Sequence, residues 1–381
     1  MPLNERLEES VELLVTSGEE VGMQVAVCTS TGDVLAHVCG GVTRLGDRVR
    51  VTERTAFRIF SATKGITATA LHVQAAKGRI GYDDLIVEHW PEFGQGGKHR
   101  ATVRDALTHS VGIPQMPDGV SVEAMCDWDR MIEAVARLEP LWEPGTRSGY
   151  HAYTFGWIIG ELVRRTDPAR RPFCDFVDQE VGRPLGMDRF WLGSVPVDAE
   201  IAALVDARGS VDRSGLRGRA IPAHLDTSEA VFGRPDVQRS CHPAAGAVSD
   251  ALSVARHYAA LSRGGRASLF TNDHVSELSA IVTGEEDQVL GRRIRKALGY
   301  WVAGPAQDAT APMGTESTSF GHPGAGGSIG WADRSRAIGV GIVKNLMSPV
   351  GPDAKATLRL GRIIRAEVPP SVSDGGEPQA S

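Results

Sequence analysis

The sequence predicts a mixed α/β (α+β) protein, in which an antiparallel sheet flanked by helices carries an inserted all-helical domain. Strand-like runs occur near both ends of the chain, whereas the middle is typical of helices and loops. Strands at both ends with helices between them favour one sheet domain assembled from the two ends. We therefore expect an α/β domain from residues 1–80 and 245–366, a mainly helical domain from 81–244, and a disordered tail from 367–381.

The first elements form one helix and one hairpin. Residues 1–18 mix acidic and basic residues around an apolar stripe, which predicts an amphipathic helix with one buried face made of Leu7, Val11 and Leu14. Residues 22–42 contain two strand-like runs on either side of the turn signal STGD. That arrangement predicts a β-hairpin.

The next element is a helix that is apolar on most sides. Residues 66–76, ITATALHVQAA, are rich in alanine, and Gly78 stands where a C-terminal cap is expected. Ser61 opens this segment. A helix of this composition is usually buried, so Ser61 would lie at the N-terminus of a central helix, where backbone N–H groups favour negative charge.

The middle and the end of the chain complete the pattern. Helical periodicity is expected over 102–114, 128–140, 153–166, 171–186 and 248–265. The Gly/Arg-rich stretch 205–224 predicts a surface excursion. Residues 320–347 form two alternating segments around a turn at 332–336, and residues 357–368 predict a closing helix.

Composition excludes several classes of function. Hydrophobic residues make up 41% of the chain and charged residues 23%, the balance of a globular protein. The net charge is −6 and no Lys/Arg block stands out, so neither a nucleic acid nor a membrane is expected as a partner. No segment has transmembrane length, and residues 1–18 lack the apolar core of a signal peptide. We expect a cytoplasmic location, with the oligomeric state left open.

The cysteines predict free thiols. They are odd in number and widely scattered, with no CxxC or Cys/His zinc spacing, at Cys28, Cys39, Cys126, Cys174 and Cys241. We expect buried reduced thiols, no disulfide framework and no metal. No phosphate-binding loop or dinucleotide fingerprint is present, so no cofactor is expected.

Ser61 and Lys64 are a candidate nucleophile and base. A lysine one helical turn from a serine lies on the same face, so the two side chains can touch. Lys64 could take the serine proton only if burial or nearby positive charge lowers its pKa. The alternative is an ordinary helix-capping serine with a surface lysine one turn away.

Three motifs resemble those of the serine β-lactamase and penicillin-binding protein superfamily, in its class C-like branch, and most closely the family VIII carboxylesterases. The first is FSATKG around Ser61, followed by an Ala/Thr-rich helix. The second is EPGTRSGYHAY, in which Tyr150 follows a PG turn, and the third is FGHPGAGG, at residues 320–327. The motifs come in the family's order over about residues 20–365. The resemblance implies a β-lactamase/transpeptidase-like fold.

The resemblance also implies roles for single residues. Ser61 matches the nucleophile, Lys64 its partner base, and Tyr150 the tyrosine that shares the proton and passes it to the leaving group. A tyrosinate between two cations would be a competent base. The backbone N–H groups of Ser61 and Ala325 would form the oxyanion hole.

The third motif departs from the lactamase pattern. His322 stands where lactamases carry the lysine of Lys-Thr-Gly, Pro323 replaces the threonine, and Gly324 is kept. In the second motif, Ala152 replaces the asparagine of Tyr-x-Asn. These changes weaken recognition of a carboxylate beside the scissile bond and of a β-lactam amide, while leaving the acylation machinery in place.

Several further residues are candidate substrate contacts. His322 and Gly324 would border the acyl group. His151 could tune Tyr150 or simply face the helical domain. Tryptophans could line an acyl pocket, although core packing is the commoner role; they are Trp142, Trp157, Trp301 and Trp331.

A competing nucleophile motif is also present. The run GGSIG around Ser328 fits the G-x-S-x-G elbow of α/β-hydrolases, which needs a helix after the serine. The following residues predict a turn and a strand, so Ser328 is not expected to be the nucleophile.

The sequence therefore predicts a serine hydrolase that forms an acyl-enzyme on Ser61 and hydrolyses carboxylic esters of small molecules. Three alternatives stay open. The same acyl-enzyme could serve an acyltransferase that acts on an activated acyl substrate in natural-product biosynthesis. The protein could be a β-lactamase or a D-aminopeptidase-like amidase, or a ligand-binding relative without turnover.

Overall fold

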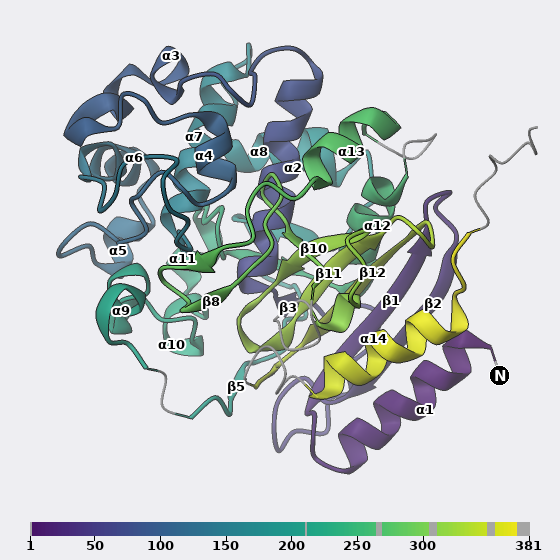
Figure 1. Ribbon diagram of the computed structural model, residues 1–381. Helices are drawn as coiled ribbons and strands as arrows, with labels where there is room; N and C mark the ends of the chain where they lie inside the picture. The colour runs from purple at the N-terminus through teal and green to yellow at the C-terminus, as the bar shows by residue number, and fades with distance from the viewer. Residues whose placement is uncertain (1, 210–211, 264–268, 305–310, 349–354, 372–381) are drawn as a thin grey trace, which may run out of the picture.

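A six-stranded antiparallel sheet forms the centre of the fold. The computed structural model describes residues 2–209, 212–263, 269–304, 311–348 and 355–371. The strand order is β2-β1-β12-β11-β10-β9. These strands are β1 (Gly22–Thr29), β2 (Val34–Gly41), β9 (Trp301–Val302), β10 (Ser319–Pro323), β11 (Ile329–Asp333) and β12 (Ile338–Lys344). The first hairpin thus pairs with the last strands of the chain, side by side in Figure 1.

Two terminal helices cover one face of this sheet. They are α1 (Leu3–Thr16) and α14 (Lys355–Glu367), which contact each other (Figure 1). The apolar stripe expected on α1 is buried against the sheet, and Leu360 and Ile364 of α14 join the same core cluster. The strands contribute their alternate side chains to this layer, including Ile329, Trp331, Val340 and Ile342.

Glycines let a helix lie directly on the opposite face. There α12 (Ala251–Ser262) packs on β1, β11 and β12. A Cβ atom on Gly339 would lie 1.9 Å from the backbone nitrogen of Ala259, and one on Gly341 would lie 2.3 Å from the carbonyl oxygen of Ala251. The close approach of helix and sheet therefore depends on the absence of side chains here. The central helix α2 (Thr63–Ala76) touches β10 on the same side.

Short helices and loops build the other half of the molecule (Figure 1). Helix α7 (Thr154–Thr166) packs on α2. The remaining helices are α3 (Ile86–His89), α4 (Val103–Leu107), α5 (Val122–Met125), α6 (Trp128–Arg137), α8 (Phe173–Val177), α9 (Gly215–Ala220), α10 (Glu229–Phe232), α11 (Pro235–Arg239) and α13 (Asn272–Ser279). Two small sheets join segments that are distant in the sequence: β3 (Phe57–Arg58), β6 (Ala247–Ser249) and β4 (Phe190–Leu192); and β5 (Val205–Asp206) with β13 (Leu346–Met347). A local hairpin pairs β7 (Glu286–Asp287) with β8 (Arg292–Arg293).

The predicted elements at both ends of the chain are confirmed. The hairpin, the helix after Ser61 and the strand pair around 332–336 form as expected. The exact domain boundaries stay a prediction. Residues 372–381 of the expected tail lie outside the described residues. Among the helices described here, none has the length and apolarity needed to cross a membrane.

The expectation that all five cysteines are free is wrong. Cys174 of α8 and Cys241, after α11, form a disulfide, with Cα atoms 6.2 Å apart. Cys28, Cys39 and Cys126 are free thiols. The two partners are separated by 67 residues and have no diagnostic spacing, so only tertiary packing brings them within bonding distance.

Candidate active site

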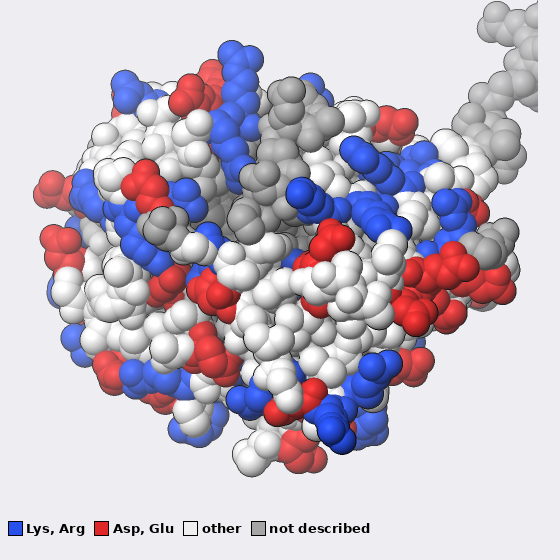
Figure 2. Space-filling view, turned by 90° about the horizontal axis from the view of Figure 1, so that it is seen from below, with Lys and Arg blue, Asp and Glu red and all other residues white. Residues whose placement is uncertain are grey.

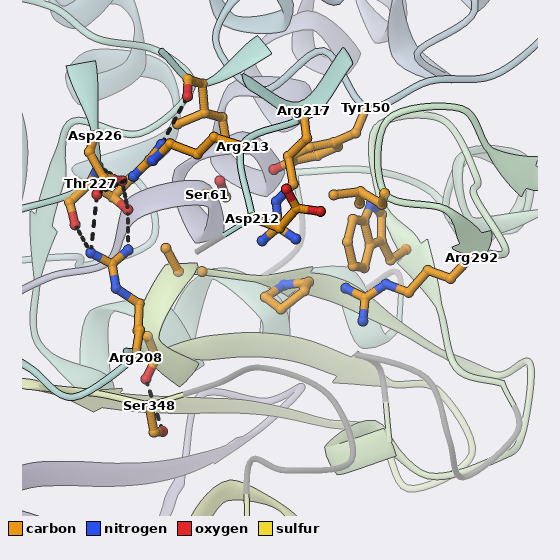
Figure 3. A pocket seen from close by; sticks show the side chains of 17 residues that line it. Ser61, Tyr150, Arg208, Asp212, Arg213, Arg217, Asp226, Thr227, Arg292 and Ser348 are labelled. Atoms are coloured by element: carbon orange, nitrogen blue, oxygen red, sulfur yellow. Dashed lines mark hydrogen bonds and ion pairs between the residues drawn. The ribbon is translucent and has the colours of Figure 1, made fainter. Parts of the chain in front are cut away.

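The nucleophile candidate lies in a tight turn at the start of α2. Ser61 is in a short 3₁₀ turn, η1 (Phe60–Ala62), directly before the helix. Phe60 has a φ of 44°, a left-handed conformation that is uncommon for a residue with a bulky side chain. Such local strain is typical of functional turns. Ser61 is half-buried, and its hydroxyl lines the cavity in Figure 3.

Lys64 meets the condition set for a base. Its side chain is fully buried, and its Nζ lies 3.1 Å from the Ser61 Oγ and 3.0 Å from the carbonyl oxygen of Ala244. Burial lowers the pKa of Lys64 well below its usual value because no carboxylate offsets the loss of water. The neutral amine is therefore accessible, and it can accept the serine proton. The alternative of a surface lysine is excluded.

Tyr150 completes the triad from the helical half. Its hydroxyl hydrogen-bonds with Ser61, and the Nζ of Lys64 lies 4.8 Å from the centre of its ring. Burial raises the pKa of Tyr150, and neither its bond with Ser61 nor the charge of Arg292 reverses this effect. The raised pKa favours a neutral phenol in the free protein over the tyrosinate considered from the sequence. A neutral phenol beside a neutral amine is the arrangement that the burial favours.

A buried ion pair holds the backbone around Tyr150. The Oδ1 of Asp287 accepts hydrogen bonds from the N–H groups of Tyr150 (3.0 Å), Val289 and Leu290 (both 2.9 Å). Its Oδ2 lies 2.7 Å from the Nζ of Lys296, and both side chains are almost fully buried. Carboxylates that accept several backbone bonds fix local geometry. Asp287 and Lys296 were missed in the sequence because nothing in their local pattern sets them apart.

The third motif borders the nucleophile as the resemblance implied. A Cβ atom on Gly324 would lie 2.2 Å from the carbonyl oxygen of Ile59, so only glycine fits beside the nucleophile turn. Gly324 and Ala325 both line the cavity that contains Ser61. Ala325 opens a short turn, η6 (Ala325–Gly327), at the end of β10. An oxyanion hole from the N–H groups of Ser61 and Ala325 stays a prediction.

His322 lies behind the cavity wall and is uncharged. Its ring stacks on Tyr150, with centroids 6.1 Å apart, and lies 5.1 Å from the ring of Trp301. Burial, reinforced by Lys64, lowers the pKa of His322 to about 3. A neutral imidazole therefore stands where the related lactamases carry a cation. Trp301 lines the cavity, which the sequence left undecided.

The expectation that His322 contacts the substrate is wrong, because His322 is buried and does not line the cavity. Two further candidate substrate contacts do not reach the cavity either. Trp331 is fully buried in the core cluster under α1 and α14, on the other face of the sheet. His151 is buried as well: its Nε2 accepts the N–H of Ile113, and its Nδ1 bonds the carbonyl oxygen of Gly149. Neither side chain lines the cavity. These bonds favour the structural role for His151 that the sequence left open.

The competing serine is structural. Ser328 is buried, and its hydroxyl accepts the backbone N–H of Lys344 at 3.2 Å. It is followed by strand β11 rather than by the helix that a nucleophile elbow needs.

The cavity in front of Ser61 has a volume of about 370 Å³. Its lining includes the basic residues Arg208, Arg213, Arg217 and Arg292, the acidic residues Asp212 and Asp226, and the apolar residues Ile221, Leu290 and Trp301 (Figure 3). Most of the charged residues come from 205–224. The described residues of this segment are mostly exposed, as the predicted surface excursion requires, and they also form one wall of the cavity, which the sequence did not predict. The repeated arginines of this segment were the one feature of the sequence that could have indicated its place at the cavity.

One group of metal-type ligands is present among the residues that the structure describes. It consists of Asp84, Glu88 and His89 at α3, and none of them lines the cavity.

The sheet order, the serine at the start of a central helix and the lysine one turn later define a protein of the β-lactamase/transpeptidase class. The chain belongs to the beta-lactamase family: residues 7–363 match the family model described as "Beta-lactamase". It is 33% identical over 319 residues to the protein called esterase/beta-lactamase LipL of Mycobacterium tuberculosis, covering 77% of this chain and 70% of LipL.

Solved structures agree with this assignment. The chain resembles a family VIII carboxylesterase with a TM-score of 0.86 and 26% identity, covering 95% of this chain and 97% of the other. It also resembles a penicillin-binding protein homologue from Caulobacter crescentus, with a TM-score of 0.84 and 27% identity over 94% of this chain and 96% of the other. The fold predicted from the three motifs is thereby confirmed.

Proposed function

We propose that the protein is a serine carboxylesterase that hydrolyses carboxylic esters of small molecules through an acyl-enzyme on Ser61. The observation that supports this proposal most directly is the contact between Ser61 and the buried amine of Lys64. The Ser61 Oγ and the Lys64 Nζ lie 3.1 Å apart, and Ser61 lines the cavity. Relatives called an esterase and a carboxylesterase support the reaction class.

The proposed chemistry runs in two steps. Ser61 attacks the ester carbonyl while Lys64 takes its proton, and the N–H groups of Ser61 and Ala325 stabilise the oxyanion. The alkoxide leaves with the proton of Tyr150, which Lys64 then replaces. Water next attacks the acyl carbon and gives its proton to the Lys64–Tyr150 pair, which returns one to Ser61.

The direct test is turnover of p-nitrophenyl butyrate by wild type and by Ser61→Ala. We expect the variant to lose at least about 10³-fold in kcat, because the nucleophile is essential to the covalent route. The matched control is Ser328→Ala, which removes the competing serine and should keep most of the activity. Equal rates for wild type and Ser61→Ala would sink the proposal.

A second assay separates the alternative reactions. Adding an amine or an alcohol tests for acyl transfer: an acyltransferase would divert product away from the free acid, whereas an esterase would not. Nitrocefin tests for β-lactamase activity, which we expect to be low. Ala152 offers no amide for a β-lactam side chain, and the neutral His322 offers no positive charge for its carboxylate.

Location and partners stay proposals. We propose a small-molecule ester as the substrate, with no resident cofactor. The cytoplasmic location was inferred partly from free thiols, and the Cys174–Cys241 disulfide removes that part of the basis.

A further inference from the structure

The wall of the cavity carries an excess of positive charge. Among the described residues that line it, four arginines face two aspartates, whereas the whole chain has a net charge of −6. The face seen in Figure 2 shows basic and acidic side chains intermixed, with an acidic gathering at one edge. The arginine excess at the cavity is therefore a local feature. It calls for an explanation in terms of what enters there.

Two of the four arginines are fixed in a network on one side of the cavity. Arg213 pairs with Asp226 at 2.5 Å and donates to the carbonyl oxygen of Ile221. Arg208 pairs with Asp206 at 2.6 Å and donates to both oxygens of Thr227. These bonds brace the segment that forms the wall (Figure 3). Asp212, which also lines the cavity, lies within electrostatic reach of Arg217.

The other two arginines approach from different elements. Arg217 comes from α9 and Arg292 from β8, and Figure 3 shows both side chains reaching the cavity that contains Ser61 and Tyr150. The positive charge of Arg292 lowers the pKa of the Tyr150 phenol. Its guanidinium therefore lies within electrostatic reach of the reacting groups. A substrate placed on Ser61 would have this charge beside it.

Arg217 and Arg292 each have another arginine close by in the sequence, and these neighbouring arginines do not line the cavity. Arg293 follows Arg292 in β8, where successive side chains point to opposite sides. Arg219 lies two residues after Arg217 in α9. Both are exposed, and neither contributes to the cavity lining. The two pairs separate the effect of a charge inside the cavity from that of a charge on nearby surface.

We propose that Arg217 and Arg292 bind an anionic group of the substrate, so that the preferred ester carries a carboxylate or a phosphate away from the scissile bond. This inference rests on the proposed esterase function and names its substrate class. Guanidinium groups pair with carboxylate and phosphate through charge-assisted, often bidentate hydrogen bonds. The anion lies on the arginine side of the cavity, while Ser61 faces the ester carbonyl. The group belongs either to the acyl chain or to the alcohol.

Matched esters test the proposal and distinguish the two sources. For the acyl side, the mono-p-nitrophenyl ester of adipic acid is compared with the same ester whose second carboxyl is methylated. For the alcohol side, the butyrate ester of 4-hydroxybenzoate is compared with that of 4-hydroxybenzamide. We expect at least one charged ester to exceed its neutral partner by about 10-fold or more in kcat/KM, the size of a charge-assisted hydrogen bond. Added salt should reduce the ratio.

The variants locate the effect. Arg217→Gln and Arg292→Gln should each lower the charged-to-neutral ratio several-fold, whereas Arg219→Gln and Arg293→Gln should leave it unchanged. Because the ratio is measured within each protein, a general loss of activity or of folded protein cancels. Wild-type ratios near one for both pairs would overturn the proposal, as would equal effects of cavity and surface variants. Turnover of the neutral esters by wild type, but not by Ser61→Ala, would still support the esterase function in that case.

Discussion

At the scale of single residues, protonation decides which group can act as the base. Lys64 is buried with no carboxylate to hold its proton, and burial lowers its pKa. Tyr150 is buried as well, and its pKa is raised. Both shifts favour the uncharged forms. In the proposed mechanism, the proton of Ser61 would therefore pass first to the amine of Lys64 rather than to a phenolate.

The expected pH dependence of kcat/KM follows from the lowered pKa of Lys64 and the raised pKa of Tyr150. Lys64 is active when neutral, so kcat/KM should fall as the pH falls through its lowered pKa and reach a plateau above it. The raised pKa of Tyr150 leaves that plateau without a second inflection until strongly alkaline pH. The measurement is kcat/KM for p-nitrophenyl butyrate over pH 5–9, corrected for spontaneous hydrolysis.

The neighbouring histidines provide the control. Burial lowers the pKa of His322 to about 3 and that of His151 to about 4, so both stay neutral over the measured range. His322→Asn should therefore retain an acidic limb. If that limb vanished in the variant, the titrating group would be the imidazole and the role of Lys64 as base would be wrong.

At the scale of elements, a buried pair ties the segment carrying Tyr150 to the strands β7 and β8. Asp287 accepts the N–H of Tyr150, and Lys296 donates to Ser148 two residues before it. We expect Asp287→Ala to lower kcat by about 10-fold or more, since small misplacements of a catalytic group are costly. It should also lower stability by about 3–5 kcal/mol, because Lys296 is left buried without its partner.

A double variant separates positioning from stability. Asp287→Asn with Lys296→Met removes both charges but keeps an amide oxygen that can accept the Tyr150 N–H. It should recover most of the kcat lost in Asp287→Ala, with KM little changed throughout. Recovery of the melting temperature without recovery of kcat would show that the charge itself, rather than the backbone anchor, supports the reaction.

The contact between α12 and the sheet gives a second prediction at this scale. Gly339→Ala should destabilise the protein by about 1–3 kcal/mol or more, because the new methyl group would meet the backbone of Ala259. Gly284→Ala is the matched control: its Cβ atom would meet nothing closer than 3.8 Å, so its effect should stay within about 0.5 kcal/mol. Urea unfolding of both variants provides the measurement. Equal midpoints would contradict the close packing inferred here.

At the scale of the whole molecule, features set by local motifs could be predicted from the sequence, whereas features set by tertiary contacts could not. The contact between Ser61 and Lys64 could be predicted because the two residues are three positions apart, about one helical turn. Trp331 was misplaced, although strand register settles its side: His322 pairs with Gly330, so Trp331 points to the opposite face. Register needs the partner strand, and one sequence does not reveal it.

Contacts between residues far apart in the sequence could not be predicted from local sequence patterns. The hydrogen bond from the Tyr150 N–H to Asp287 joins residues 137 positions apart, and only the folded chain brings them together. The arginines of 205–224 were visible, but a loop-like composition does not say whether a segment faces solvent or closes a cavity.

The Cys174–Cys241 disulfide acts at the same scale and carries the last prediction. It closes a loop across 67 residues of the helical half, and a loop of that length corresponds to about 4 kcal/mol of stabilisation in the chain-entropy account. Cys241 also lies three residues before Ala244, whose carbonyl oxygen accepts the bond from Lys64. Reduction should therefore lower the melting temperature and, by loosening this segment, lower kcat.

The experiment compares wild type with and without dithiothreitol, and adds Cys174→Ser and, as a matched control, Cys126→Ser. Cys126 is a free thiol, so its replacement should leave the response to reductant unchanged. In Cys174→Ser the melting temperature should already be low, and reductant should have no further effect. If dithiothreitol lowered the melting temperature of wild type and Cys174→Ser equally, the stabilising bond would lie elsewhere. A melting temperature that falls while kcat holds would mean that other contacts keep the Ala244 carbonyl in place. One such contact is the hydrogen bond that the Thr67 hydroxyl donates to the carbonyl oxygen of Pro243, the residue before Ala244, at 2.6 Å.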